Sequence, residues 1–307
     1  MRAIKMHGAG NDYLYLDAVS QPQLEHRSDL PELVRAMSHR HTGVGSDGVI
    51  LVARPTPAAA AAGATVRMRM FNADASEGAM CGNGVRCVAK FAHERLGNRQ
   101  DPMLVETGRG VLALRVLPGG GRVERVTVDM GAPILDPARI PTTLRGGPRG
   151  VLDAPVPPDA PADLRQGLDA AGHDGLVCAL SMGNPHAVFF CAQAQAVPLE
   201  RAGPAAETWP AFPGRVNAHF VRRLAPDRAL VRTWERGSGA TMACGTGACA
   251  VLVAGVLTGR LNRAAVIELP GGELRIEWPS DDAGVLMTGP AQEVCEVLWP
   301  ADAPADA

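Results

Sequence analysis

The segment MCGNGVRC at residues 80–87 organises the chain, and a second copy of it, ACGTGAC, lies at residues 243–249. In each copy a cysteine precedes Gly-X-Gly and an apolar run of helical length. Because glycines at a helix start leave backbone N–H groups accessible, each cysteine is expected at a helix N-terminus. The partial positive charge there stabilises a thiolate and can hold a carboxylate. We therefore expect Cys81 and Cys244 to be two activated thiols, one from each half of the chain.

The surroundings of the two cysteines also repeat. Cys244 follows Cys81 by 163 residues, and the same offset relates several other positions. These pairs are Arg69 with Arg232, Phe71 with Trp234, Asn72 with Glu235 and Gly108 with Gly271. Gly10-Asn11 matches Gly183-Asn184 ten residues out of register. We interpret the chain as a duplicated unit of about half its length, which predicts two similar lobes facing each other across a pseudo-two-fold axis.

The composition restricts the classes of protein. A length of 307 residues suggests about two domains, and 46% hydrophobic with 20% charged residues is ordinary for a soluble globular protein. A net charge of −2 argues against nucleic acid or a membrane surface as partner. No apolar run reaches transmembrane length, and the first residues read as a strand, not a signal peptide. Seven cysteines do not suggest a disulfide framework, so we expect a cytoplasmic protein. The oligomeric state stays open, with a homodimer as one alternative.

Regular elements are expected throughout the chain. Strands are expected at 2–6, 13–19, 49–52, 66–71, 103–107, 110–117, 122–130, 176–181, 187–190, 216–221, 229–234 and within 284–299. Helices are expected at 31–40, after each cysteine, at 198–206 and within 151–175, while 54–64 reads as a mobile connection. We predict a first lobe at 1–130, to which a strand at about 292–307 returns, and a second lobe at 131–291 that includes a crossover at 131–150.

Polar loops follow several of these strands. The loop at 8–12, GAGND, is interpreted as a hairpin turn in preference to a ligand contact through Asn11. The segment GVGSDG at 43–48 is a weak phosphate-loop candidate, because a strand and not a helix follows its glycines. The loop at 72–77 precedes Cys81 and is a place where ligand contacts concentrate.

In the second half, His186 follows Asn184 in MGNPH, and both a structural and a catalytic role are open for it. Asn217 alternates within a strand and points to one face. For Glu235-Arg236 a functional role is favoured, since the repeat places Glu235 where Asn72 stands.

Two thiols are compatible with three kinds of chemistry. A metal site is disfavoured, because C-x5-C and C-x4-C are poor zinc spacings and Cys87 and Cys249 lie in apolar helical faces. A redox pair lacks a CxxC or nucleotide-binding motif, although oxidation to a Cys81–Cys244 disulfide is expected when no ligand is bound. Two-base proton transfer uses the whole repeat, since one thiolate removes a proton and a thiol on the opposite face returns one.

No cofactor is expected. Lys5 and Lys90 are the two lysines of the sequence, and neither lies in a motif for lysine-bound pyridoxal phosphate.

The chain resembles the diaminopimelate epimerase family, whose members interconvert LL- and meso-2,6-diaminopimelate without a cofactor. The segments that carry the resemblance are GAGNDY at 8–13, GVGSDG at 43–48, FNADASEGAMCGNGVRC at 71–87, SMGNPH at 181–186, ERGSGATMACGTGAC at 235–249 and PGGEL at 270–274. The resemblance implies an α/β (α+β) fold of two pseudo-symmetric lobes, each a mainly antiparallel sheet wrapped around a central helix. The active site is then expected in the cleft between the lobes.

The resemblance also implies the roles of individual residues. Cys81 and Cys244 correspond to the two acid/base thiols, and His186 and Glu235 to groups that tune or position them. The substrate-binding residues implied are Asn11, Asn72, Gly82, Asn83, Asn184, Asn217, Glu235, Arg236, Gly245 and Thr246. The implied partner is a small amino-acid substrate, with no cofactor and no metal.

Two positions depart from the family pattern. Gly48 stands where some members carry a ligand-contacting glutamine, and Ala75 stands where glycine is usual. The related proline and hydroxyproline racemases are the alternative reading, but they lack the Glu-Arg-Gly segment and usually carry His at the position of Asn83. An arginine suits the carboxylate of a second amino-acid group, remote from the reacting carbon. Such a substrate therefore fits Arg236 better than proline does. A non-catalytic amino-acid-binding module is the third alternative.

Overall fold

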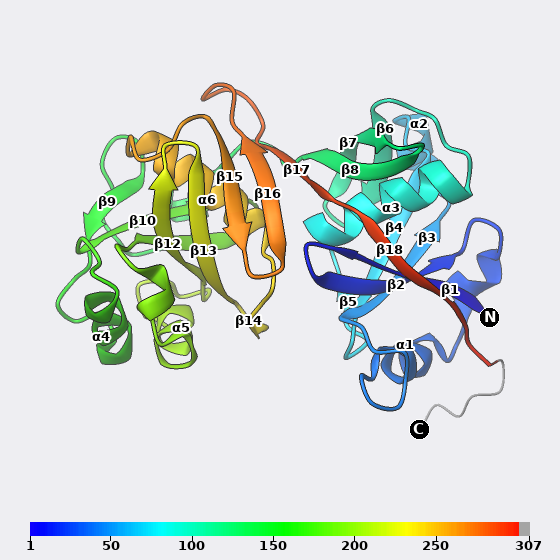
Figure 1. Ribbon diagram of the computed structural model, residues 1–307, viewed down its shortest axis with the longest axis horizontal. Coiled ribbons are helices and arrows are strands. Elements are labelled where there is room, and N and C mark those ends of the chain that lie inside the picture. The colour runs from blue at the N-terminus through cyan, green and yellow to red at the C-terminus, as the bar shows by residue number, and fades with distance from the viewer. Residues whose placement is uncertain (301–307) are drawn as a thin grey trace. The chain divides into compact units, whose positions relative to one another are not determined.

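Residues 1–300 are described by a computed structural model (Figure 1). The predicted closing strand at 292–307 extends beyond them, so its residues 301–307 lie outside the described residues. The chain divides into two compact units. Unit 1 is Met1–Asp129 together with the segment that begins at Thr288, and unit 2 is Met130–Met287. Each combines one curved sheet with helices, so the expected mixed α/β class is confirmed.

Unit 1 contains most of the strands of the first half of the chain. These are β1 (Arg2–Gly8), β2 (Asn11–Asp17), β3 (Gly48–Ala53), β4 (Val66–Asn72), β5 (Glu77–Gly78), β6 (Met103–Thr107), β7 (Gly110–Gly119), β8 (Arg122–Asp129) and β18 (Gln292–Leu298). Its helices are η1 (Pro22–His26), α1 (Leu30–Ser38), α2 (Pro57–Ala61) and α3 (Gly82–Arg95). β17 (Leu286–Pro290) lies where the chain passes between the units.

The sheet of unit 1 runs in the order β18, β1, β2, β3, β4, β6, β7 and β8. The pairs β2–β3 and β4–β6 are parallel, and the others are antiparallel. The helix α3 packs against strands from β1 through β8, so the sheet curves around it. Its side chains from Val85 to Ala92 are buried, including the cationic Arg86 and Lys90, because sheet surrounds this helix instead of covering one face.

Unit 2 contains the corresponding set of elements. Its strands are β9 (Val151–Pro155), β10 (Leu176–Ser181), β11 (Pro185–Phe190), β12 (Asn217–Ala225), β13 (Arg228–Glu235), β14 (Gly239–Ala240), β15 (Ala264–Leu269) and β16 (Gly272–Glu277). Its helices are η2 (Pro137–Arg139), α4 (Ala162–Ala170), η3 (Ala194–Ala196), α5 (Leu199–Glu207) and α6 (Gly245–Leu257). The apolar helix α6 packs against β10, β11, β12, β15 and β16 (Figure 1).

The two sheets have the same pattern of pairing. Unit 2 runs β9, β10, β11, β12, β13, β15 and β16, with β11–β12 and β13–β15 parallel and the other pairs antiparallel. This is the order found from β18 to β7 in unit 1. The short strands β5 and β14 each pair with the strand that precedes them. The duplication read from the sequence is therefore present in the fold.

The strand registers match individual residues of the two units. In unit 1 Gly48 pairs with Asn72, and in unit 2 Ala218 pairs with Trp234, so Asn217 takes the place of Gly48. The parallel pair β11–β12 sets His186 beside Asn217. The equivalent pair β2–β3 sets Leu14 beside Val49, which makes Tyr13 the counterpart of His186 and Asn11 the counterpart of Asn184. The looser match of Gly10-Asn11 with Gly183-Asn184 is thus confirmed.

Two segments differ from the sequence expectation. The Ala/Pro-rich stretch at 54–64 contains the helix α2, because the Thr56 side chain accepts a hydrogen bond from the N–H of Ala59 and alanine favours helix. The lead-in at 151–175 contains the strand β9 as well as the expected helix, and β9 pairs with β10. In the described residues no helix is both long enough and apolar enough to span a membrane.

Candidate active site

Cys81 is the N-cap residue of α3, as the sequence predicts. Its backbone is extended, with φ −127° and ψ 121°, and its sulfur accepts a hydrogen bond from the N–H of Gly84 at 3.5 Å. A Cβ on Gly84 would lie 2.8 Å from the side chain of Ile50, so glycine lets this turn of the helix press against β3. The hydroxyl of Tyr15 donates to the Gly84 carbonyl at 3.1 Å and fixes the same turn.

The thiol of Cys81 donates to the side-chain oxygen of Asn11 at 3.1 Å. The amide nitrogen of Asn11 in turn donates to a carboxylate oxygen of Asp47 at 2.6 Å, and the backbone N–H of Asp12 donates to the same oxygen. Arg40 pairs with the other oxygen of Asp47 at 2.7 Å. Because a carboxylate accepts and does not donate, Asp47 fixes which end of the Asn11 amide faces the thiol.

Tyr13 follows Asn11 on β2 and is 4% exposed. Burial raises its pKa, and the nearby Cys81 and Asp47 raise it further. The phenol therefore remains protonated and available as a donor beside Cys81.

Gly48 and Ala75 are the two positions that are expected to depart from the family pattern, and both have a positive φ. Gly48 has φ +153°, and a Cβ there would lie 2.0 Å from the carbonyl oxygen of Phe71, so this backbone does not accommodate a glutamine. Ala75 adopts φ +71°, a conformation that glycine takes without the Cβ clash. Asn72, at the start of this loop, donates to the hydroxyl of Ser76 at 2.9 Å. Gly82 and Asn83 are buried in the first turn of α3 beside Cys81.

Cys244 is the N-cap residue of α6, also as predicted, and it is 2% exposed. Its sulfur lies 3.7 Å from the hydroxyl of Thr246. Burial raises the pKa of the Cys244 thiol well above its usual value, and the charge of Glu235 raises it further. The expectation that the helix terminus lowers this pKa is wrong here, because burial and the neighbouring carboxylate outweigh the helix end. Glu235 accepts a hydrogen bond from the Thr241 hydroxyl at 2.6 Å.

The turn that carries Glu235 and Arg236 is held from two sides. Asn217 accepts from the N–H of Arg236 at 3.0 Å and donates to the carbonyl of Pro185 at 2.9 Å. The guanidinium of Arg236 is exposed and donates to the carbonyl of Gly214.

On the other side of this turn lies Glu207, the last residue of α5, which is 7% exposed. Its carboxylate accepts from the N–H of Gly237 at 3.0 Å, the indole of Trp234 at 2.8 Å and the guanidinium of Arg215 at 3.3 Å. Burial alone would raise the pKa of Glu207, but these hydrogen bonds lower it.

His186 is buried in a line of hydrogen bonds. Its Nε2 lies 3.0 Å from the side-chain oxygen of Asn184, and its Nδ1 lies 2.9 Å from Nε2 of His219. Nδ1 of His219 lies 2.9 Å from the hydroxyl of Thr233. Asn184 also donates to Thr246 at 3.4 Å, which connects this line to the first turn of α6.

Within unit 1 the fold thus gathers Asn11, Gly82 and Asn83 around Cys81, with Asn72 at the end of the strand beside Gly48. Within unit 2 it gathers Glu235, Gly245 and Thr246 around Cys244, and Asn184 and His186 reach this site through Thr246. Four residues that contact the site residues or the turn that carries them were not predicted from the sequence. They are Tyr13, Asp47, Glu207 and His219. Asp47 lay in the GVGSDG motif, but the other three carry no local signal.

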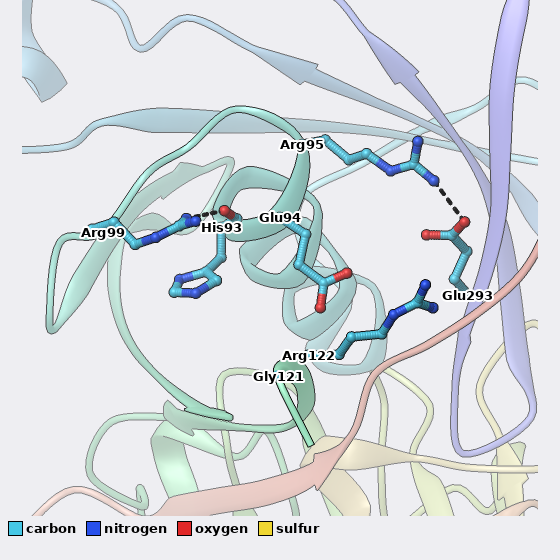
Figure 2. A pocket seen from close by; sticks show the side chains of 7 residues that line it. All are labelled: His93, Glu94, Arg95, Arg99, Gly121, Arg122 and Glu293. Atoms are coloured by element: carbon cyan, nitrogen blue, oxygen red, sulfur yellow. Dashed lines mark hydrogen bonds and ion pairs between the residues drawn. The ribbon is translucent and has the colours of Figure 1, made fainter. Parts of the chain in front are cut away.

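A different pocket lies at the C-terminal end of α3 (Figure 2). Its lining residues are His93, Glu94, Arg95, Arg99, Gly121, Arg122 and Glu293. Arg95 pairs with Glu293, and Arg99 donates to the carbonyl of His93. This pocket contains none of the predicted site residues. Among the described residues, no group of three or more His, Cys, Asp or Glu side chains is arranged to hold a metal ion.

The fold is shared with solved structures that are described as a phenazine biosynthesis protein, an epimerase and a racemase. A PhzF-family phenazine biosynthesis protein from Bacillus anthracis superposes with a TM-score of 0.64 at 13% identity, covering 97% of this chain and 98% of that one. A predicted epimerase from Pseudomonas aeruginosa gives 0.65 at 17%, with 96% and 98% covered. A probable proline racemase from Agrobacterium radiobacter gives 0.61 at 16%, with 98% and 93% covered. At these identities the likeness concerns the fold alone.

Sequence relatives are more specific. The family model described as diaminopimelate epimerase matches residues 3–135 and 178–294. The chain is 43% identical over 302 residues to diaminopimelate epimerase from Moorella thermoacetica, covering 98% of this chain and 100% of the relative. It is 45% identical over 299 residues to that of Desulforudis audaxviator, covering 97% and 99%. The chain belongs to the diaminopimelate epimerase family. The resemblance seen in the sequence and the prediction of an isomerase are thereby confirmed.

Proposed function

We propose that the chain converts LL-2,6-diaminopimelate to the meso isomer by proton transfer between Cys81 and Cys244, without a cofactor. The observation that carries the proposal is that each cysteine caps the N-terminus of a buried helix at the matching place of a duplicated fold. Membership in the diaminopimelate epimerase family supports the substrate.

Inversion of the α-carbon by proton transfer requires one base and one acid on its opposite faces. One sulfur, as thiolate, removes the α-proton, and the other, as thiol, delivers a proton to the opposite face. The carbanion charge delocalises onto the substrate's α-carboxylate, where the exposed N–H groups of the helix first turns can stabilise it. We propose that the two predicted lobes, 1–130 and 131–291, each contribute one thiol to the reaction.

The surroundings of the two sulfurs suit this division of work. The Cys81 thiol already has an acceptor in Asn11, which orients its proton. Cys244 has the carboxylate of Glu235 as a neighbour, which can take the thiol's proton when the substrate binds. His186, through Asn184 and Thr246, positions the first turn of α6.

Substrate recognition is assigned to the amides and to Arg236. Asn11, Asn72, Asn83, Asn184 and Asn217, with the N–H groups of Gly82, Gly245 and Thr246, offer donors and acceptors for the amino and carboxylate groups. The exposed guanidinium of Arg236 suits the second carboxylate of a substrate with two amino-acid ends. A proline-type substrate has no such second end.

In a cell, the product would serve as a precursor of lysine and peptidoglycan, and we place the reaction in the cytoplasm. The proposed partner is the small amino-acid substrate.

The test is incubation of the pure protein with LL-diaminopimelate in heavy water. Formation of meso product with deuterium at one α-carbon is expected. Proline and hydroxyproline serve as comparison substrates, since turnover of these instead would favour the racemase alternative. Binding without any deuterium exchange would leave only an amino-acid-binding module.

A further inference from the structure

His219 is a buried histidine with no part in the proton transfer described above. It lies on β12, opposite Thr233 on β13 and beside β11, which carries His186. The exposed fractions of His186 and His219 are both 0%, and that of Thr233 is 2%. Water therefore does not compete for the hydrogen bonds among these three side chains.

The chemistry of the partners fixes the direction of each bond. The side-chain oxygen of Asn184 can only accept, so Nε2 of His186 must donate to it. In a neutral imidazole the other nitrogen then accepts, so Nδ1 of His186 receives its hydrogen bond from Nε2–H of His219. Nδ1 of His219 is left to accept from the Thr233 hydroxyl.

The stated direction of these hydrogen bonds requires that neither ring is protonated. Burial lowers the pKa of His219 to about 3, which keeps its ring uncharged at neutral pH. The orientation assumed for the Asn184 amide is supported by its nitrogen, which donates to the Thr246 hydroxyl.

Unit 1 shows that the fold itself does not need a histidine at this place. Through the matched registers, Ile50 is the counterpart of His219, because it pairs with Tyr15 as His219 pairs with Val188. Both side chains press on a glycine in the first turn of the central helix. A Cβ on Gly84 would meet Ile50, and one on Gly247 would meet His219 at 2.2 Å.

The two units differ at the residue next to this position, which is His186 in unit 2. The counterpart of His186 in unit 1 is Tyr13, whose hydroxyl has no tautomers to select. Unit 2 places the imidazole of His186 there, and His219 lies within hydrogen-bond distance of its Nδ1. A buried polar side chain where the same fold accepts isoleucine suggests a functional reason.

We propose that His219 is a positioning residue that holds His186 in its Nε2–H tautomer and thereby keeps the Asn184 amide nitrogen turned toward Thr246, beside Cys244. Its effect on turnover rests on the proposed epimerase function, whereas its effect on the tautomer of His186 does not.

The test is NMR of the protein with ¹⁵N-labelled histidines, in which long-range ¹H–¹⁵N correlations identify the tautomer of each ring. His186→Gln and His219→Gln assign the two signals by their disappearance. In the wild type both rings should show Nε2–H. An Nδ1–H signal for either ring overturns the proposal, whether or not the protein epimerises diaminopimelate.

Two variants then separate positioning from packing. His219→Ile copies the side chain that unit 1 carries, so it should fold, as circular dichroism and thermal melting will check. It removes the donor to Nδ1 of His186, so His186 should show a mixture of tautomers and kcat should fall by about tenfold, the loss of one buried hydrogen bond. His219→Gln can place an amide N–H near the position of Nε2, so it should keep the tautomer and most of kcat.

Each outcome decides the matter. An unchanged His186 tautomer in His219→Ile overturns the proposal, and so does equal activity of His219→Ile and wild type. Should His219→Ile not fold, Thr233→Val removes the donor to His219 and should give mixed tautomers of His219, with Thr233→Ser as the matched control. A wild type with the predicted tautomers but no turnover would reject the proposed function alone.

Discussion

The thiol of Cys81 lies 3.1 Å from the side-chain oxygen of Asn11, and this contact depends on a third residue. Asp47 holds the amide nitrogen of Asn11 at 2.6 Å, so the oxygen is turned to the sulfur. Asp47→Asn would let the amide of Asn11 rotate. Since a hydrogen bond to a charged group contributes about 1.5–3 kcal/mol, kcat/KM should fall roughly tenfold to a hundredfold. Steady-state kinetics with Asp29→Asn, an exposed carboxylate paired with Arg27, as control will measure this. Equal losses in both variants would contradict it.

Removal of either thiol should abolish turnover. Cys81→Ala and Cys244→Ala each delete one of the two proposed proton carriers, and a general acid or base contributes about 10²–10⁴-fold. The rate of meso product formation is the measurement. Cys295→Ala, which removes an exposed thiol of β18, should keep the wild-type rate. Wild-type turnover in either active-site variant would exclude the two-base scheme.

The charge of Glu235 should be visible in the titration of Cys244. Because the carboxylate raises the pKa of the thiol, Glu235→Gln should lower that pKa and also reduce turnover. Thiolate absorbance, corrected by subtraction of the Cys244→Ala variant, should therefore rise at lower pH in Glu235→Gln than in wild type. Glu277→Gln, on β16, is the control and should leave the curve in place. A shift to higher pH would show that Glu235 acts on the sulfur in another way.

Glu207 should determine the stability of the turn that carries Arg236. In Glu207→Gln one oxygen becomes an NH2 group that faces a donor, either the N–H of Gly237 or the indole of Trp234, so the free energy of unfolding should fall by about 1–3 kcal/mol. The substrate KM should rise because Arg236 is less well held. Urea unfolding and kinetics measure the two effects, and Glu200→Gln, exposed on the same helix, should show neither.

Acid should destabilise the protein in part through His219. Its pKa is lowered to about 3 in the folded state, whereas an unfolded histidine titrates near 6.5, so the unfolded chain binds more protons between these values. The stability that neutral His219 contributes is therefore fully present above about pH 6.5. This contribution decreases by about 1.4 kcal/mol per pH unit as the pH falls toward 3. Urea unfolding at pH 7.5 and 4.5 should show this loss in wild type but less of it in His219→Gln. His41→Gln, an exposed histidine, should behave as wild type.

The sequence predicted the elements around each cysteine because their signals are local. Cysteine, Gly-X-Gly and an apolar run lie within about a dozen residues, and a helix N-terminus follows from them alone. The same local reading failed at residues 54–64, where a Thr56 cap and alanines form α2 despite the prolines.

The duplication and both helix-capping cysteines could thus be read from the sequence by itself, since they rest on composition and spacing along the chain. The residues that contact and orient each site residue were decided by the tertiary structure. Asp47 meets Asn11 across 36 residues, and His219 meets His186 across 33, because the register of neighbouring strands sets these contacts. Burial likewise decided the high pKa of Cys244, since desolvation depends on what the folded chain packs around the sulfur and not on the motif that contains it.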